Sequence, residues 1–312
     1  MKKEWMRYLS YAGLGLFFFV FFLFWTFPYE ILKNRIIHQI EDQLGGQYHL
    51  KIKEMSAGFF TGFTFKNVEV IKTEGGKEWL MFKTPKLRVN PSWIAWMRNK
   101  TSVSFKIQTT QGKVVGTYYN SPEKNEISVE FDSLRLSDLH SFTSSAGLSF
   151  KGMIEGDVDL TLFKKDPSKN SGKVDISFVD LNLASFSIKL DPNSPEGMPL
   201  PQIQLTGAKN SKLLGEVKQN ILEIKELSFK GGQIDLNLKG KITLAPHFED
   251  YRIFLEGKLK PSSLLAQLIP YLVLFEQQKL PDGSFELQVS DSLMNPMVML
   301  GKMKLWPPQH PM

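Results

Sequence analysis

The sequence predicts a mainly β protein, in which an N-terminal transmembrane helix and an amphipathic helix lead into an elongated, curved antiparallel β-sheet with few short helices. Three observations support this fold class. The chain begins with a long uncharged apolar segment, one stretch with helical periodicity follows, and from residue 48 onward apolar and polar residues mostly alternate. With 42% apolar and 22% charged residues, the 312-residue chain is expected to be folded and largely exposed to water.

The first element is the segment 8–29, which carries no charged residue. At about 1.5 Å per residue, residues 9–27 reach roughly 28 Å, close to the ~30 Å hydrocarbon core of a bilayer. A cleaved signal peptide has a shorter apolar region followed by small residues, whereas this segment ends in WTFPYEILKN. We therefore predict an uncleaved transmembrane anchor at 8–29 and a cytoplasmic tail at 1–7. Residues 30–312 are expected outside the cytoplasm, because long domains translocate largely regardless of charge.

The second element is an amphipathic helix in EILKNRIIHQIEDQL. Its apolar residues Leu32, Ile36, Ile40 and Leu44 recur at spacings of four, and Gly45 follows directly. This spacing places them on one face, and a glycine often ends a helix. We expect that face to pack on the first strands.

Beyond residue 48 the dominant pattern has period two, which is typical of strands with one buried face. Turn-forming pairs such as Asp166-Pro167 and Asp282-Gly283 separate the runs, so the strands are expected to form an antiparallel meander. Between 174 and 190 the alternation shifts by one residue twice, which predicts bulges or strand ends there. The clearest alternating runs are 50–52, 63–70, 103–107, 127–131, 154–162, 174–178, 234–238, 251–255 and 285–289.

A few segments depart from this alternation. The stretch 90–100, with two Trp residues, predicts a short turn or helix, and 262–278 predicts an apolar helix interrupted at Pro270 that is too short to span a bilayer. The Pro- and Gly-rich stretch 193–201 is the best candidate for a boundary within the large domain. The pentapeptide LSFKG occurs at 148–152 and again at 227–231, which suggests one supersecondary unit copied along the sheet.

No residue type or spacing in the chain indicates catalysis. The chain has no cysteine, its five histidines show no ligand spacing, and it carries none of the familiar hydrolase, zinc-protease or nucleotide-binding motifs. Asp157-Val158-Asp159 lies in an alternating run, where the acids are expected on the wet face of a strand. The net charge of +6 is spread along the chain, which argues against nucleic acid. We predict no enzyme and assign no catalytic, cofactor-binding or metal-binding residue.

The informative surface is the apolar face of the predicted sheet. With few helices available to cover it, the face is filled by its own side chains, by another sheet or by an apolar ligand. A groove that accommodates lipid and a closed, self-packed sandwich are both consistent with the pattern. The candidate groove residues, which should share one concave side, are Ile176, Phe178, Ile234, Leu236, Leu238, Ile253 and Leu255.

The order of these features resembles the AsmA-like proteins and, more closely, the type II secretion system protein N (GspN) family of bacteria. The resemblance is carried by three stretches. They are FPYEILKNRIIHQIEDQLGGQYHLKIKEM after the anchor, GFFTGFTFKNVEVIK, and LPDGSFELQVSDSLMNPMVML near the end. None of them is a catalytic fingerprint, so the resemblance transfers no catalytic residue.

The resemblance implies a single-pass inner-membrane protein of a Gram-negative bacterium, with a periplasmic domain built as an AsmA-like β groove. For the type II secretion family it implies a non-enzymatic component of the secretion apparatus, with other secretion-system proteins as partners. For the wider AsmA-like class it implies an alternative function, in which the protein binds or transfers phospholipid or another acyl-chain ligand between the inner and outer membranes.

Overall fold

The computed structural model describes residues 29–43, 48–58, 62–74, 76–138, 149–188, 198–207, 211–245, 250–268, 275–293 and 295–306, with a few positions between 11 and 26. Most of the predicted anchor, 8–29, and the whole tail, 1–7, lie outside the described residues. Within the described part, no helix has both the length and the apolar character needed to cross a membrane. The prediction of a mainly β chain with few short helices is confirmed.

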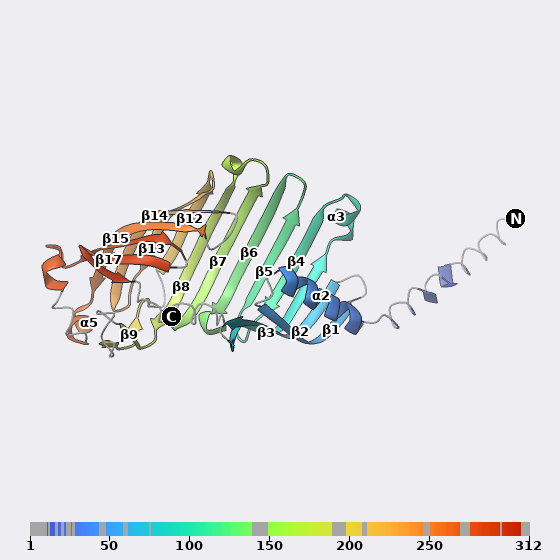
Figure 1. Ribbon diagram of the computed structural model, residues 1–312, viewed down its shortest axis with the longest axis horizontal. Coiled ribbons are helices and arrows are strands. Elements are labelled where there is room, and N and C mark those ends of the chain that lie inside the picture. The colour runs from blue at the N-terminus through green and yellow to red at the C-terminus, as the bar shows by residue number, and fades with distance from the viewer. Residues whose placement is uncertain are drawn as a thin grey trace.

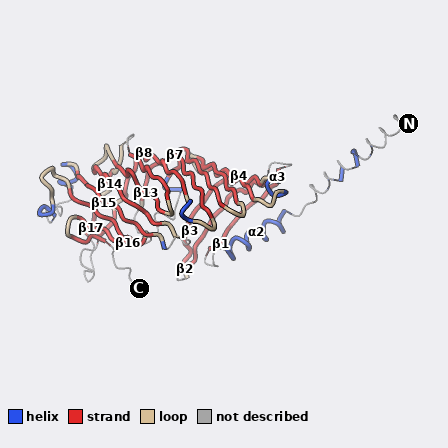
Figure 2. The backbone as a smooth tube through the Cα atoms, turned by 90° about the horizontal axis from the view of Figure 1, so that it is seen from above, coloured by secondary structure: helices blue, strands red, loops and turns tan. Residues whose placement is uncertain are grey.

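One open antiparallel sheet of sixteen strands forms the body of the protein, and it twists along its length (Figures 1 and 2). Along the main path of the sheet, neighbouring strands are consecutive in the chain except that β8 pairs with β12. The main path is β1 (Tyr48–Gly58), β2 (Gly62–Glu74), β3 (Lys77–Pro91), β4 (Thr101–Gln108), β5 (Lys113–Asn120), β6 (Lys124–Arg135), β7 (Phe150–Phe163), β8 (Ser171–Leu183), β12 (Ser211–Lys218), β13 (Ile221–Phe229), β14 (Ile234–Thr243), β15 (Arg252–Pro261), β16 (Phe285–Ser292), β17 (Asn295–Leu300) and β18 (Met303–Trp306).

Three short strands lie between β8 and β12. β11 (Ile203–Gln204) pairs with β8, while β9 (Phe186–Ile188) and β10 (Met198–Leu200) form a separate two-stranded sheet. Residues 193–197 of the candidate boundary lie outside the described residues. The pairing of β8 with β12 carries the main sheet from one side of this region to the other.

The helices of the described part are short. They are α2 (Tyr29–Gln43), α3 (Trp93–Met97), α5 (Ser263–Leu268) and the single turns η1 (Leu136–Asp138) and η2 (Pro167–Lys169). The amphipathic prediction for α2 holds in part: α2 contacts β1, and Leu32 and Ile36 are half-buried, but Ile40 remains 37% exposed. A carboxylate oxygen of Glu41 accepts a hydrogen bond from the backbone N–H of Leu50 at 2.9 Å, which ties the end of the helix to the first strand.

Apolar side chains form continuous rows across the strands, because residues that face each other in antiparallel strands point to the same side of the sheet. One such row, made only of apolar residues and glycine, is Met55, Phe65, Leu87, Ile107, Val114, Phe131, Gly156, Ile176, Leu213, Leu227, Leu238, Gly257, Leu287, Leu300 and Met303. A second row, from Ala57 in β1 to Trp306 in β18, is likewise made only of apolar residues and glycine.

In β1 to β3 the apolar side chains change from one face of the sheet to the other at one level of the strands. Ile52 is half-buried and Glu54 is exposed although they lie two residues apart, so the alternation in β1 slips by one residue between them. In β2 the slip coincides with Asn67, whose φ of 48° is left-handed, and Pro85 lies at the same level of β3. Proline donates no backbone hydrogen bond, so the ladder is interrupted here and the side-chain faces can switch.

Other irregularities in the sheet match the predicted bulges. The register of β7 and β8 shifts between Lys151 and Met153, close to Asp180, whose φ is 49°. β8 then ends at Leu183, so the two shifts expected between 174 and 190 are a bulge and a strand end.

The prediction from the repeated pentapeptide LSFKG, that one supersecondary unit is copied along the sheet, is wrong. The pentapeptide at 148–152 leads into β7, whereas its copy at 227–231 ends β13 and enters a turn. In the first copy, Gly152 with φ 138° sits at a bulge that the strand passes through, while in the second Gly231 with φ 76° reverses the chain.

Gly156 allows β7 and β8 to approach closely in the middle of the apolar face. Its φ is 138°, and a Cβ atom there would lie 2.0 Å from the carbonyl oxygen of Asp175. We expect Gly156→Ala to lower the free energy of unfolding by about 2–4 kcal/mol, because backbone atoms must move. Gly116→Ala is the matched control, since the atoms nearest to its Cβ would be side-chain atoms of the Phe105 ring, which can shift without moving the backbone, and it should cost about 1 kcal/mol. Urea titration followed by circular dichroism measures both, and equal costs would contradict this account.

Candidate functional site

The seven candidate groove residues lie on one face of the sheet. Ile176 faces Leu213, which faces Leu227, which faces Leu238, so β8 and β14 present these side chains on the same side. Two residues along β14, Leu236 continues the face, and in β15 Ile253 and Leu255 face the corresponding residues of β14. Phe178 and Ile234 lie two residues from Ile176 and Leu236, respectively, in the same alternation.

Burial divides these residues into two groups. Leu238 and Leu255 are 3% and 5% exposed and belong to a core built on β13 to β17, whereas the other five are only partly buried. Phe275, which comes from the connection after α5, is 8% exposed and belongs to that same core. A side chain from outside the sheet therefore helps to fill the C-terminal part of the apolar face.

A second covered region lies where β8 meets β12. Leu265 of α5 is 2% exposed and packs with Leu181 and Leu183 of β8 and with Ile203 of β11. The rings of Phe178 and Phe229 meet edge to face with 5.4 Å between their centroids. This seam separates the covered strands of the C-terminal part from the strands that precede it.

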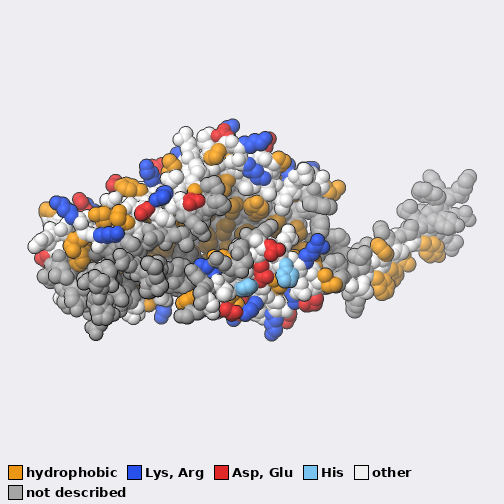
Figure 3. Space-filling view, viewed as in Figure 1, with side chains coloured by type: hydrophobic (Ala, Val, Ile, Leu, Met, Phe, Trp, Pro, Cys, Tyr) orange, Lys and Arg blue, Asp and Glu red, His pale blue; other side chains and the backbone are white. Residues whose placement is uncertain are grey.

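The apolar face of β4 to β8 is built differently. Its core cluster centres on Val114, Leu134 and Ile154, and every described member comes from these strands or from η1. Many of the remaining apolar side chains of these strands are only partly buried. Figure 3 shows hydrophobic side chains lining a hollow near the middle of the molecule. We call the apolar face from β2 to β8, apart from the end of β8 that Leu265 covers, the open half. We call the part from β12 to β17 the covered half.

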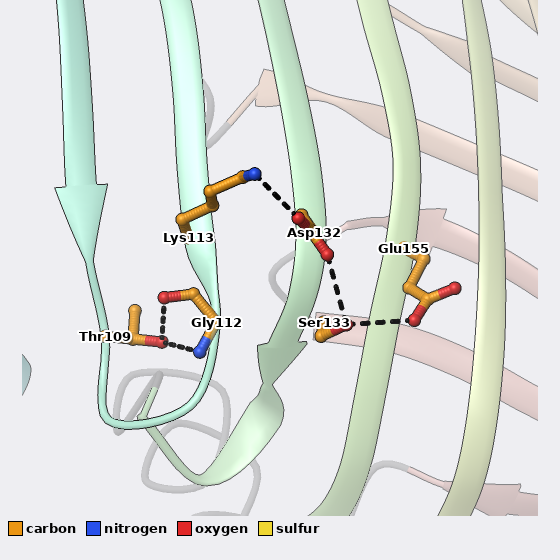
Figure 4. A network of polar contacts seen from close by, with 6 residues as sticks. All are labelled: Thr109, Gly112, Lys113, Asp132, Ser133 and Glu155. Carbon is orange, nitrogen blue, oxygen red and sulfur yellow. Dashed lines mark hydrogen bonds and ion pairs between the residues drawn. The ribbon is translucent and has the colours of Figure 1, made fainter.

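From β4 onward the opposite face of the sheet is mostly polar, and ion pairs join its neighbouring strands. At the ends of β5 and β6, the ammonium group of Lys113 lies 2.9 Å from a carboxylate oxygen of Asp132, and the hydroxyl of Ser133 donates to Glu155 at 3.1 Å (Figure 4). The hydrogen bond from Lys113 lowers the pKa of Asp132 and raises that of Lys113 itself. A shallow depression of about 590 Å³ lies beside this network.

A similar arrangement on the same polar face involves Glu216 of β12. Hydrogen bonds from Lys218 and Lys225 lower the pKa of Glu216 to about 2. These groups are open to solvent, and each pairs a base with an acid across or along strands. The arrangement stabilises the sheet and offers no unpaired, buried group for chemistry.

Residues that could suggest a reaction are dispersed in the structure. Asp157 and Asp159 point to the polar face of β7, as the alternation predicts. Both described histidines lie near Glu41, with His49 Nδ1 at 3.6 Å and His38 Nδ1 at 3.9 Å. His140, His247 and His310 lie outside the described residues. Among the described residues, no group of three or more acids or histidines could hold a metal ion.

No protein-family model matches the chain, and neither the curated proteins nor the solved structures include a match. Sequence reasoning also missed two features of the apolar face. The alternation showed which residues share the face, but not that Leu265 covers the seam at β8 and that Phe275 covers the strands after it. The apolar run 264–275 was the only available signal, and it does not specify which strands it meets.

Proposed function

We propose that this chain is a non-enzymatic, inner-membrane-anchored protein whose periplasmic sheet binds the acyl chains of phospholipid along its open half. The observation that carries the proposal is the continuous apolar surface of β2 to β8, whose described cluster is built from its own strands and η1 and meets the cluster of Leu265 only at Leu136 and Phe178. Most apolar side chains of these rows are only partly buried, and a contiguous apolar surface that remains accessible on a folded protein is typical of a binding surface.

The dimensions of the open half suit such a ligand. Adjacent strands lie about 4.8 Å apart, so the seven strands from β2 to β8 span roughly 29 Å across the sheet. A bilayer core of ~30 Å holds two acyl chains end to end, so one chain needs about 15 Å. The two apolar rows therefore offer room for the chains of a two-chain lipid along the floor. The polar opposite face keeps the protein soluble beside the membrane.

A component of the type II secretion apparatus is our second candidate function. The observation that favours it is the edge of β1, which pairs only with β2 among the described strands. Such an edge can receive a strand from a partner protein through backbone hydrogen bonds. In this case the sheet would serve as a scaffold, and secretion-system proteins would be its partners.

The experiment that tests the first proposal is quantitative mass spectrometry of lipid bound to the full chain after purification in mild detergent. We expect phospholipid in stoichiometric or greater amount. The control is a fusion of residues 1–29 to an unrelated soluble domain, which measures the lipid held by the anchor alone.

Lipid no more abundant than in the control would contradict the lipid proposal. Recovery of identified secretion-system proteins in place of lipid would support the second candidate. Because both measurements use the same preparation, one sample distinguishes the two functions.

A further inference from the structure

The connection between β3 and β4 exposes apolar side chains at the tip of a hairpin. It contains α3, whose sequence is Trp-Ile-Ala-Trp-Met. Ile94 is 68% exposed and Met97 is 83% exposed, and their spacing of three places them on neighbouring positions of one helical face. Directly after them come Arg98 and Lys100, which are also exposed.

The exposure of these side chains is fixed by the local structure. The hydroxyl of Ser92 accepts a hydrogen bond from the N–H of Ala95 at 3.4 Å, as at a helix N-terminus. At the other end, Asn99 adopts a left-handed φ of 55° and the N–H of Lys100 donates to the carbonyl of Ala95 at 3.0 Å. Because the turn is closed at both ends, Ile94 and Met97 are held outward.

Three other hairpin connections have a different composition. The β4–β5 connection is Thr-Thr-Gln-Gly, the β5–β6 connection is Ser-Pro-Glu, and the β12–β13 connection is Gln-Asn. Polar residues are ordinary for such turns, which project into water. The five apolar residues of α3 are therefore not a general property of the sheet's turns.

We propose that α3 inserts into the interfacial region of the lipid bilayer and forms a second membrane contact of this protein. Trp is enriched at the level of the lipid head groups, and exposed Ile and Met favour the acyl boundary below them. Arg98 and Lys100 flank this surface with positive charge, which complements anionic head groups. The charge complementarity favours a bilayer over a protein surface as the occupant.

The location of α3 agrees with this assignment. α2 starts at Tyr29, where the predicted anchor ends. At about 1.5 Å per residue its 15 residues span roughly 22 Å, which is the distance that α2 can place between the end of the anchor and the first strand. α2 and α3 lie at the same end of the sheet, at the right of Figure 1. Two contacts at one end would fix the direction of the sheet relative to the membrane. The inference uses neither the open half nor its ligand.

The absence of cysteine from the chain permits a direct test. The full-length Met97→Cys variant is labelled with an environment-sensitive fluorophore and reconstituted into vesicles of phosphatidylethanolamine and phosphatidylglycerol. A nitroxide attached to a shallow acyl position should quench about half of the emission or more, since interfacial helices lie about 5–10 Å into the boundary. The matched control is Gln111→Cys, exposed at the opposite end of β4, where the nitroxide should quench little and aqueous iodide strongly.

A further variant separates insertion from simple proximity. Adding Ile94→Glu to the Met97→Cys protein should restore quenching by iodide and remove most of the quenching by nitroxide lipid, while the circular dichroism spectrum stays unchanged. Equal iodide quenching at positions 97 and 111 would overturn the proposal. So would a blue-shifted emission at 97 that nitroxide lipid does not quench, because that result would identify a protein surface as the occupant.

Discussion

Leu238→Asp is expected to unfold the covered half of the sheet. Leu238 is 3% exposed and lies in the core that includes Leu255, Phe275 and Phe285. The change removes a buried leucine and places an unpaired carboxylate among apolar side chains, at a combined cost of about 4 kcal/mol or more. Domains are typically stable by only about 5–15 kcal/mol, so the melting midpoint by circular dichroism should fall sharply or disappear.

The neighbouring position on the same strand provides a matched control for this change. Asn237 is exposed on the polar face and faces Lys258 of β15. Asn237→Asp introduces the same charge one residue away and should change stability by no more than about 0.5 kcal/mol. A Leu238→Asp protein that melts like the wild type would show that this half is not a closed core.

Ile176→Asp is expected to leave the protein folded but to reduce the phospholipid bound to it. Ile176 is only half-buried in the open half, where a carboxylate can reach water, so the protein should keep its spectrum and most of its thermal stability. Bound phospholipid should fall by on the order of tenfold, because the charge interrupts the apolar floor on which acyl chains lie. Mass spectrometry of the purified protein measures the loss.

Ser177→Asp is the control for the lipid effect. Ser177 is the next residue of β8, is exposed on the polar face and faces Lys212. The variant carries the same charge at the same height of the sheet and should retain wild-type lipid. If both variants lose lipid equally, or if Ile176→Asp unfolds the protein, the assignment of the open half is wrong.

Much of the fold follows from the alternation alone. Residues such as Ile127 and Val129 had to share a face with Leu160 and Val158, because a strand has period two and antiparallel neighbours match face to face. The turn at Asp282-Gly283 and the end of β8 at Leu183 were equally readable, since they depend on local backbone chemistry.

The contrast between the two halves could not be predicted in this way. Whether Leu238 is a core residue or a groove residue depends on Phe275, which is distant in sequence and has no pattern that names its partners. The exchange of faces at Asn67 was hidden for a similar reason. A left-handed asparagine and a proline on the next strand act together there, and neither alone requires the alternation to slip.

The order of the strands also shapes how the chain can fold. Apart from the step from β8 to β12, each strand on the main path pairs with the one made just before it, so most closures span a short loop and cost little entropy. The longest of these connections, residues 262–284, joins β15 to β16. A chain that crosses a membrane from its N-terminus would deliver β1 first and each template strand before the strand that needs it. The growing sheet then rarely waits for a distant segment, and apart from the edge of β1 only its newest edge is unpaired at any moment.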